Sequence, residues 1–272
     1  MRNRCYLPRL NNVNPEVIMQ WDMERDSAFV TGGGSGIGQA IALKLGEQGV
    51  KVAVADVDAA KAEGTAARIA EAGGTALPLA LDVTRSDDVN AAIARTHAEF
   101  GSLAYLMNVA GISQQKPVHE ISDSDWARMI DVHLNGTFYC IRAAVPLMME
   151  AGFGVIASLS SMHGLKGQEW ASHYSAAKAG IAALTKAVAR EVSEHGIRIN
   201  ALAPGPIDTP MWRRGLTGEA LERRKSDRSK LVPMGRLGEA AEVANLAVFL
   251  LSPASSYMTG QIVGVNGGEL MP

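Results

Sequence analysis

Tyr174 and Lys178 lie four residues apart, and Ser161 lies thirteen residues before the tyrosine. A tyrosine hydroxyl is a poor base at neutral pH because its ordinary pKa is about 10. On a helix, a lysine one turn further along lies on the same face, and its positive charge is expected to favour the phenolate and lower that pKa. The three residues predict acid/base chemistry, with a buried structural tyrosine and a chance lysine as the alternative.

A glycine-rich loop at residues 31–38 follows a short apolar run. It contains Gly32, Ser35, Gly36, Ile37 and Gly38. Glycines permit positive φ and a close approach to a pyrophosphate, and the start of a helix offers N–H groups and a positive dipole end. With a strand before it and a helix after it, this loop predicts dinucleotide binding. An ordinary glycine-rich turn is the alternative.

Asp56 lies eighteen residues beyond Gly38, at the end of the second expected strand. A carboxylate at this place can accept hydrogen bonds from the ribose hydroxyls of adenosine and would repel a 2′-phosphate. Ser35 and Val57 bring no positive charge beside it. The position therefore favours NAD over NADP, and a surface turn residue is the alternative.

Three further groups of residues follow expected strands and are candidates for the cofactor site. They are Asp82 and Val83 after the third strand, Asn108, Ala110 and Gly111 after the fourth, and Pro204, Gly205, Ile207 and Thr209 after the sixth. Each group has a structural alternative, respectively a helix-initiating turn, an asparagine that satisfies backbone groups, and a proline-stiffened loop.

Apolar runs of strand length alternate with segments of helix length from Ser27 onward. Strands are expected at 28–31, 50–56, 76–81, 103–108, 155–159, 197–202 and 261–265. Helices are expected at 36–48, 58–71, 86–100, 123–150, 173–195 and 239–250, with loop and a short helix at 204–230. Pro78 predicts that the third strand lies at an edge of the sheet. Ser86 and the two aspartates after it are expected to cap the third helix.

This alternation predicts an α/β fold with a single doubly wound parallel sheet, Rossmann-like, flanked by helices on both faces. Ligands in such sheets bind beyond the carboxyl ends of the strands, where the candidate residues fall. Residues 27–272 are expected to form one dinucleotide-binding and catalytic domain. Residues 1–26 are expected to be a flexible extension, because they are rich in asparagine and have little periodicity.

The composition argues against several other classes of protein. The 272 residues carry a formal net charge of −2, without the basic surface of a nucleic-acid binder. The basic stretch at 213–230 is interrupted by acidic residues, which favours a solvated helical face. Cys5 and Cys140 are too few for a disulfide framework, no histidine spacing predicts a metal site, and no apolar run is long enough to span a membrane. A reducing cytoplasm fits.

The loop, the serine and the tyrosine–lysine pair resemble the short-chain dehydrogenase/reductase family over roughly residues 27–272. The resemblance implies that Tyr174 is the acid/base, that Lys178 lowers its pKa and binds the nicotinamide ribose, and that Ser161 hydrogen-bonds the substrate oxygen. It also implies that Asp56 sets a preference for NAD and that 204–209 lie near the nicotinamide. Family members usually form tetramers through two long helices, so a homotetramer is expected.

His133 departs from the family pattern. The family usually has asparagine at this place, where it holds a water in a proton relay. A histidine can accept and donate hydrogen bonds, so His133 is a catalytic candidate that either maintains the relay or adds a titrating step; a structural histidine is the alternative. Val109 replaces a second asparagine of the family, with little expected consequence.

The predicted function is hydride transfer between NAD(H) and a secondary alcohol or ketone. Two alternatives remain open, an NADP-dependent 3-oxoacyl-carrier-protein reductase and a non-catalytic NAD-binding regulator. Specificity is expected from segments 111–118, 162–170 and 211–230. Their mixed polar and aromatic residues suit a polyol, a sugar derivative or a functionalised cyclic ketone, without excluding an acyl thioester. The stretch from Trp212 is either a mobile lid or an ordinary surface helix.

Overall fold

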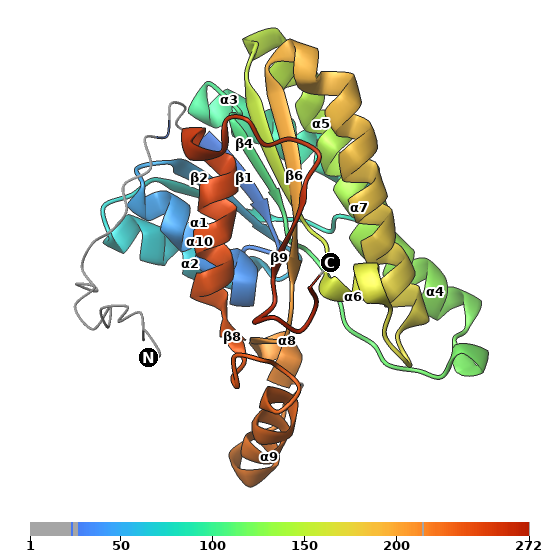
Figure 1. Cartoon of the computed structure of the whole chain (residues 1–272). Coiled ribbons are helices and arrows are strands. Elements are labelled where there is room, and N and C mark those ends of the chain that lie inside the picture. Colours follow the sequence, from blue (N-terminus) through green and yellow to red (C-terminus); the bar gives the residue numbers. More distant parts are fainter. Residues whose placement is uncertain (1–22, 24–26, 214, 272) are drawn as a thin grey trace, which may run out of the picture.

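The structure is a computed structural model that describes Met23, residues 27–213 and residues 215–271 (Figure 1). The expected flexible extension 1–26 therefore lies outside the described residues, apart from Met23. That methionine packs against the core of the sheet.

The strands form one seven-stranded parallel sheet in the order β3-β2-β1-β4-β5-β6-β9. Their bounds are β1 Ser27–Thr31, β2 Lys51–Asp56, β3 Ala76–Ala80, β4 Tyr105–Asn108, β5 Gly154–Leu159, β6 Ile197–Pro204 and β9 Ile262–Val265. The strand order reverses between β1 and β4, which is where ligands bind in sheets of this kind. The strand with Pro78 lies at the edge, as predicted.

Helices cover both faces of this sheet. The longer ones are α1 Gly36–Glu47, α2 Ala59–Glu71, α3 Ser86–Phe100, α4 Asp123–Ile130, α5 Gly136–Ala151, α7 Ser172–Val192, α9 Gly218–Ser229 and α10 Ala240–Leu251. Short elements are α6 Met162–Lys166, α8 Pro210–Arg213, the 3₁₀ turns Val118–Glu120, Ser193–His195 and Pro253–Ser255, and the strand pair β7 Ile207–Asp208 and β8 Gly238–Glu239.

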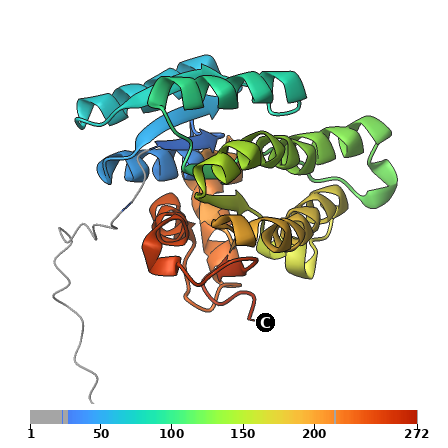
Figure 2. The same cartoon turned by 90° about the horizontal axis from the view of Figure 1, so that it is seen from above.

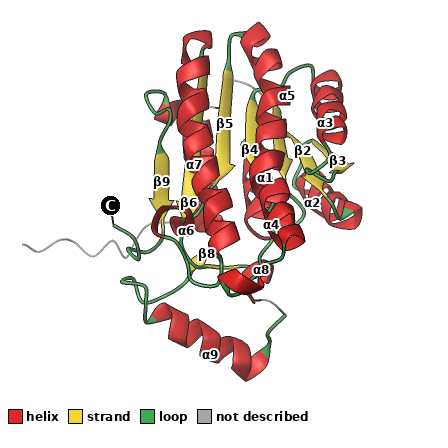
Figure 3. Ribbon diagram, turned by 90° about the vertical axis from the view of Figure 1, so that its right-hand side faces the viewer, coloured by secondary structure: helices red, strands yellow, loops and turns green. Residues whose placement is uncertain are grey.

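The two helical layers bury separate apolar clusters. On one face, Ile41, Leu45 and Val248 of α1 and α10 pack on the sheet. On the other, Ile93 of α3 and Ile141 of α5 pack with residues of α7. Figure 2 shows the layers from above, and Figure 3 shows α5 and α7 lying across one face while α9 stands beyond the carboxyl ends of the strands. The predicted doubly wound α/β fold is confirmed.

The helix expected at 123–150 is divided. A π-helical turn, Asp131–Asn135, separates α4 from α5. Asn135 Nδ2 donates to Asp131 Oδ1 at 2.7 Å across this turn, and Gly136 after it lies so close to Val83 that an added Cβ would be 2.8 Å from that side chain. The sequence period of a helix does not reveal one extra residue in a single turn.

The start of α3 also differs from the prediction. Arg85 is the N-cap residue and makes no side-chain cap, whereas Ser86 is the first helical residue. The Ser86 hydroxyl accepts a hydrogen bond from Arg142 Nη2 at 2.7 Å, a partner far away in the sequence. Asp87 and Asp88 still lie in the first turn, where negative charge suits the helix dipole.

No helix among the described residues combines the length and the apolar character that a bilayer crossing requires.

Candidate active site

Ser161, Tyr174 and Lys178 come together at the carboxyl end of β5. Ser161 is the N-cap of α6, where its Oγ accepts from His163 N at 3.1 Å. Tyr174 lies in the first turn of α7, and Lys178 follows one turn later. The Lys178 Nζ atom is 5.7 Å from the centroid of the Tyr174 ring. The two side chains therefore share a face of the helix, as the spacing predicts.

The electrostatics of this group differ from the expectation. Burial raises the pKa of Tyr174, and a hydrogen bond with the Ser161 side chain acts in the opposite direction. Lys178 is itself buried, which lowers its pKa to about 7, and its Nζ donates to the Leu159 carbonyl oxygen. Burial outweighs the Ser161 hydrogen bond, so the pKa of Tyr174 lies above its ordinary value and not below it as predicted.

His133 lies in the π-helical turn with its ring edge-on to Tyr174, at a centroid distance of 5.3 Å and an angle of 90°. Its Nε2 is 3.1 Å from the Ile112 nitrogen and 2.9 Å from the Ile112 carbonyl oxygen, so the tautomer decides which bond forms. Its buried Nδ1 has no hydrogen-bond partner among the described residues.

Burial, and then the charge of Lys178, hold the pKa of His133 well below its ordinary value. The imidazole is therefore uncharged at neutral pH, and an added titrating step in that range is not expected. Gly111 lies against this ring, since an added Cβ would be 2.5 Å from His133 Cε1. The geometry favours the structural alternative, in which His133 braces Ile112 and Tyr174.

A cavity of about 670 Å³ opens at the carboxyl ends of β1, β2 and β4. Most of the predicted cofactor residues line it: Gly32, Ser35, Gly36, Ile37, Gly38, Asp56, Asp82, Val83, Ala110, Gly111, Tyr174, Lys178 and Thr209. Asn108 does not; it is buried, and its Nδ2 donates to Ser158 Oγ at 3.1 Å between neighbouring strands. Asn108 therefore joins two strands through a side chain and not, as the alternative had it, through backbone groups.

The glycine loop has the form that a pyrophosphate requires. Gly32 has φ +64°, and a Cβ there would lie 2.9 Å from the Ala110 backbone. A Cβ on Gly38 would lie 2.0 Å from the Gly32 carbonyl oxygen. The Ser35 side chain does not cap α1, so the first N–H groups of this helix remain for an anion. These residues fit a dinucleotide.

The Asp56 carboxylate is fixed at the rim of this cavity by two backbone donors. Its Oδ2 accepts from Gly34 N and its Oδ1 from Asp58 N, both at 3.0 Å. Sequence reasoning missed a nearby cation: a Cβ built on Gly34 would lie 2.6 Å from Lys61 Cβ. Lys61 Nζ pairs with Asp58 at 2.9 Å. Its place in the first turn of the helix after Asp56 was the available signal.

Asp82 is a turn residue that also lines the cavity. Its Oδ1 accepts from Thr84 N at 3.0 Å and from Thr84 Oγ1 at 2.8 Å. Its carboxylate is thus engaged locally, and its place at the cavity keeps it a candidate cofactor residue.

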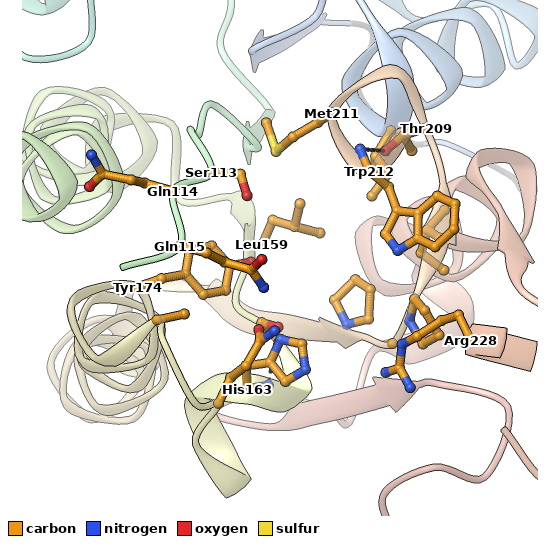
Figure 4. A pocket seen from close by; sticks show the side chains of 18 of the residues that line it. Ser113, Gln114, Gln115, Leu159, His163, Tyr174, Thr209, Met211, Trp212 and Arg228 are labelled. Atoms are coloured by element: carbon orange, nitrogen blue, oxygen red, sulfur yellow. Dashed lines mark hydrogen bonds between the residues drawn. The ribbon is translucent and has the colours of Figure 1, made fainter. Parts of the chain in front are cut away.

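A second cavity of about 510 Å³ adjoins the first on the other side of Tyr174 (Figure 4). The three expected specificity segments meet there, with lining residues that include Gln114, Gln115, Ser161, His163, Gln168, Met211, Trp212, Arg224 and Arg228. Pro204, Gly205 and Ile207 line this cavity rather than the first. Glu169 and Trp170 were expected here but do not line it, and Trp170 is 59% exposed.

A series of hydrogen bonds and an ion pair, which the sequence did not reveal, holds one wall of the second cavity. Gln114 Oε1 is 2.9 Å from His173 Nε2, and Gln114 Nε2 donates to Asp125 Oδ1 at 2.7 Å. Lys116 Nζ pairs with the other oxygen of Asp125 at 2.6 Å. Both ends of the Gln114 amide are thus engaged, so this side chain fixes the wall.

Among the described residues, no group of histidine, cysteine or acidic side chains is arranged to hold a metal. Cys140 is buried in the core, which raises the pKa of its thiol to about 12. Cys5 lies outside the described residues.

Comparison with known proteins gives the class of the chain. A family model described as "Enoyl-(Acyl carrier protein) reductase" matches residues 32–269. The chain belongs to the short-chain dehydrogenase/reductase family. It is an NAD(P)-dependent oxidoreductase that acts on CH–OH groups.

Particular relatives cover nearly the whole chain. A cis-4-hydroxycyclohexanecarboxylate dehydrogenase of Sinomonas cyclohexanicum is 43% identical over 89% of this chain and 95% of its own length. A cyclohexanol dehydrogenase of an Acinetobacter species is 39% identical over 93% and 98%. A 3-oxoacyl-[acyl-carrier-protein] reductase of Staphylococcus aureus is 38% identical over 90% and 98%.

Proposed function

We propose that this protein is an NAD-dependent dehydrogenase of alicyclic secondary alcohols, with Tyr174 as acid/base. One observation carries the proposal: Tyr174 lines both the dinucleotide cavity and the adjoining cavity. A group that exchanges a proton with a substrate while a cofactor exchanges hydride has to reach both spaces. The two relatives that act on substituted or plain cyclohexanols support an alicyclic substrate.

The residues divide the reaction between them. A bound nicotinamide would supply the hydride acceptor or donor. In oxidation Tyr174 takes the proton of the alcohol oxygen, and in reduction it returns that proton. Ser161, which bonds to Tyr174, orients the same oxygen. Lys178, one turn along the same face, would bind the nicotinamide ribose and exchange protons behind the tyrosine.

The pKa directions give the proposed reaction a pH dependence. Burial raises the pKa of Tyr174, so its protonated form predominates at neutral pH and is ready to donate to a carbonyl oxygen. The basic form needed for alcohol oxidation increases as the pH rises. We therefore expect oxidation to accelerate from neutral to alkaline pH, whereas reduction does not.

The preference for NAD rests on Asp56 at the rim of the dinucleotide cavity. A fixed carboxylate would accept hydrogen bonds from ribose hydroxyls and repel a 2′-phosphate. The nearby Lys61 pairs with Asp58, which reduces its attraction for such a phosphate.

The assembly and setting of the protein are also proposals. We propose that residues 27–272 act as one unit in a cytoplasmic homotetramer. Exposed apolar side chains on the long helices support helix packing between subunits, with Trp126 45% exposed and Phe138 40% exposed.

A 3-oxoacyl-carrier-protein reductase is the second candidate function. The description of the family model and the Staphylococcus aureus relative favour it, while Asp56 argues against its use of NADP. Comparing kcat/KM for cyclohexanol with NAD and for a 3-oxoacyl thioester with NADPH separates the two enzymes. A regulator would bind NAD and turn over neither.

Replacement of Tyr174 by phenylalanine tests the acid/base role. We expect Tyr174→Phe to lower turnover of cyclohexanol by at least about 10³-fold, because the proton-transfer group is lost, while NAD affinity stays within a few-fold. Absorbance at 340 nm measures turnover and calorimetry measures NAD binding. The exposed Tyr257→Phe is the matched control and should be unchanged. Near-normal turnover of Tyr174→Phe would end the assignment.

A further inference from the structure

Two arginines of α9 lie on the wall of the substrate cavity away from the catalytic tyrosine. Arg224 and Arg228 both line this cavity. Figure 4 shows Trp212 and Arg228 on the side opposite Tyr174. The guanidinium of Arg224 lies over the Trp212 ring, 4.7 Å from its centroid. A cavity for a plain alcohol has no need of guanidinium groups there.

Arg228 is held by the segment that follows β9. Its Nη2 contacts both carboxylate oxygens of Glu269, at 2.7 and 2.6 Å. Lys166 Nζ contacts the same carboxylate at 2.8 Å. Two cations thus share one anion, which leaves the cluster with a net positive charge. Nothing else in the described part of the chain accepts from the Arg228 guanidinium, so Nε and Nη1 keep their capacity to donate.

The charge of this cluster is stable around neutral pH. Burial raises the pKa of Glu269, but the hydrogen bonds from Arg228 and Lys166 outweigh it and hold that pKa below its ordinary value. His163 also lines the cavity, and burial followed by the charge of Lys166 lowers its pKa to about 4. The imidazole is therefore neutral, and Arg228 is the fixed cation that faces the substrate.

Apolar side chains of the same cavity are suited to an apolar ring. Met211, Trp212 and Leu231 are among its lining residues. Asp227 also lines the cavity, but its carboxylate pairs with Lys230 at 2.9 Å on the exposed side of α9. The cavity therefore combines apolar lining with a proton-exchanging side at Tyr174 and a cationic side opposite it.

We propose that Arg228 binds the carboxylate of an alicyclic hydroxy acid whose hydroxyl carbon lies at Tyr174. This inference rests on the proposed function and specifies its substrate class. Guanidinium groups form charge-assisted hydrogen bonds with carboxylates, so Arg228 selects for an acid over a neutral ring alcohol. Glu269 is the positioning residue that orients Arg228, and Arg224 adds positive charge beside it.

Two substrates that differ only in charge test the proposal. With NAD, kcat/KM is measured for cis-4-hydroxycyclohexanecarboxylate and for its carboxamide. Arg228→Gln is expected to lower kcat/KM for the acid by about 10- to 100-fold, mainly through KM, because a charge-assisted bond is lost. The carboxamide should change by less than about threefold. An equal loss for both compounds, or no loss, overturns the assignment.

Two further variants separate binding from a purely structural tie. Arg223→Gln lies on the exposed face of the same helix and should leave both substrates unchanged. Glu269→Gln removes the negative charge beside Arg228 but keeps an oxygen that accepts from it, so preference for the acid should remain. If Glu269→Gln and Arg228→Gln both lower kcat/KM for the acid and for the carboxamide alike, Arg228 has only a structural role in its ion pair with Glu269.

A binding measurement keeps this proposal separate from the proposed function. Cyclohexanecarboxylate lacks the reacting hydroxyl, and calorimetry gives its Kd for the NAD-loaded protein. Arg228→Gln should raise that Kd by about 10- to 100-fold. Absence of turnover with every ring alcohol would defeat the proposed function, whereas an unchanged Kd would defeat the carboxylate site.

Discussion

The two cavities that meet at Tyr174 differ in whether backbone or side-chain groups form them. The dinucleotide side is made largely of backbone: Gly32 and Gly38 pack against neighbouring chain, and Asp56 is fixed by two backbone N–H groups. The substrate side is made of side chains, such as Arg228 held by Glu269, 41 residues away. A backbone site presents the same groups whatever side chains surround it, whereas a side-chain site changes its ligand with a few substitutions.

This contrast agrees with what the relatives share and where they differ. Proteins that act on a cyclohexanecarboxylate, on cyclohexanol and on a 3-oxoacyl group match this chain over 89–93% of its length. Proteins of similar sequence therefore act on different substrates. Function of this kind has to be argued from the residues of the site and not from the fold.

The largest expected effect comes from adding one methyl group to the backbone-built side. In Gly38→Ala the Cβ would lie 2.0 Å from the Gly32 carbonyl oxygen, and backbone on both sides would have to move. We expect NAD affinity to fall by at least about 100-fold, because the phosphate-binding N–H groups lose their arrangement. Calorimetry with NAD measures it.

Gly64→Ala in α2 is the matched control, because nothing lies within 4 Å of the added Cβ. It should bind NAD normally and gain up to about 1 kcal/mol of stability from helix propensity. Normal NAD affinity in Gly38→Ala would show that side chains, and not the backbone of this loop, provide most of the NAD binding. The proposed difference between the two cavities would then be wrong.

An intermediate effect is expected at Lys178, which lies where the cavities meet. Burial lowers its pKa from 10.5 to about 7, so between these values the unfolded chain binds a proton that the folded chain has lost. The free energy of unfolding therefore rises with pH across this window, and the full cost is present below pH 7. Lys178→Met should stabilise the protein by up to about 4 kcal/mol at pH 7 and progressively less toward pH 10, while turnover is lost.

Denaturant unfolding at several pH values from 6 to 10 measures this difference. Lys186→Met, at an exposed position of the same helix, is the control for replacing a lysine by methionine there. If Lys178→Met changes the free energy of unfolding no more than Lys186→Met does, burial of Lys178 does not destabilise the protein.

The smallest expected effect concerns the choice of cofactor. Asp56→Asn removes the charge but keeps one oxygen to accept from the backbone. We expect the ratio of kcat/KM with NAD to that with NADP to fall by about 10- to 100-fold, since repulsion of the 2′-phosphate is lost. Glu63→Gln, at an exposed carboxylate of α2 that lines neither cavity, serves as the control. A ratio that does not change would leave Asp56 as a turn residue.

The sequence predicts the backbone-built side well because its determinants are local. Positions of glycine, the end of a strand and the start of a helix lie within a few residues of one another, so Gly32, Gly38 and Asp56 could be placed without coordinates. The edge position of β3 followed in the same way from Pro78. The relation of Tyr174 to Lys178 is equally local, since both lie on one face of α7.

The remaining features depend on contacts between distant parts of the chain. The pKa of Tyr174 moved opposite to the prediction because spacing reports the neighbouring lysine but not the burial of either group. Arg228 belonged to a stretch interpreted as a solvated helical face, which it largely is, and only the fold brings it to Glu269. The Gln114–Asp125 bond likewise has no sequence signature.

The π-helical turn at Asp131–Asn135 lets the helix segments before and after it present different faces to their neighbours. One extra residue in that turn lets His133 face Tyr174 while the apolar stripe of α5 still faces the sheet. Deleting one residue there would restore a uniform helix and rotate one half against the other by about 100°. A length change of a single position could therefore uncouple the ring beside the tyrosine from the core, although every residue type in the site was retained.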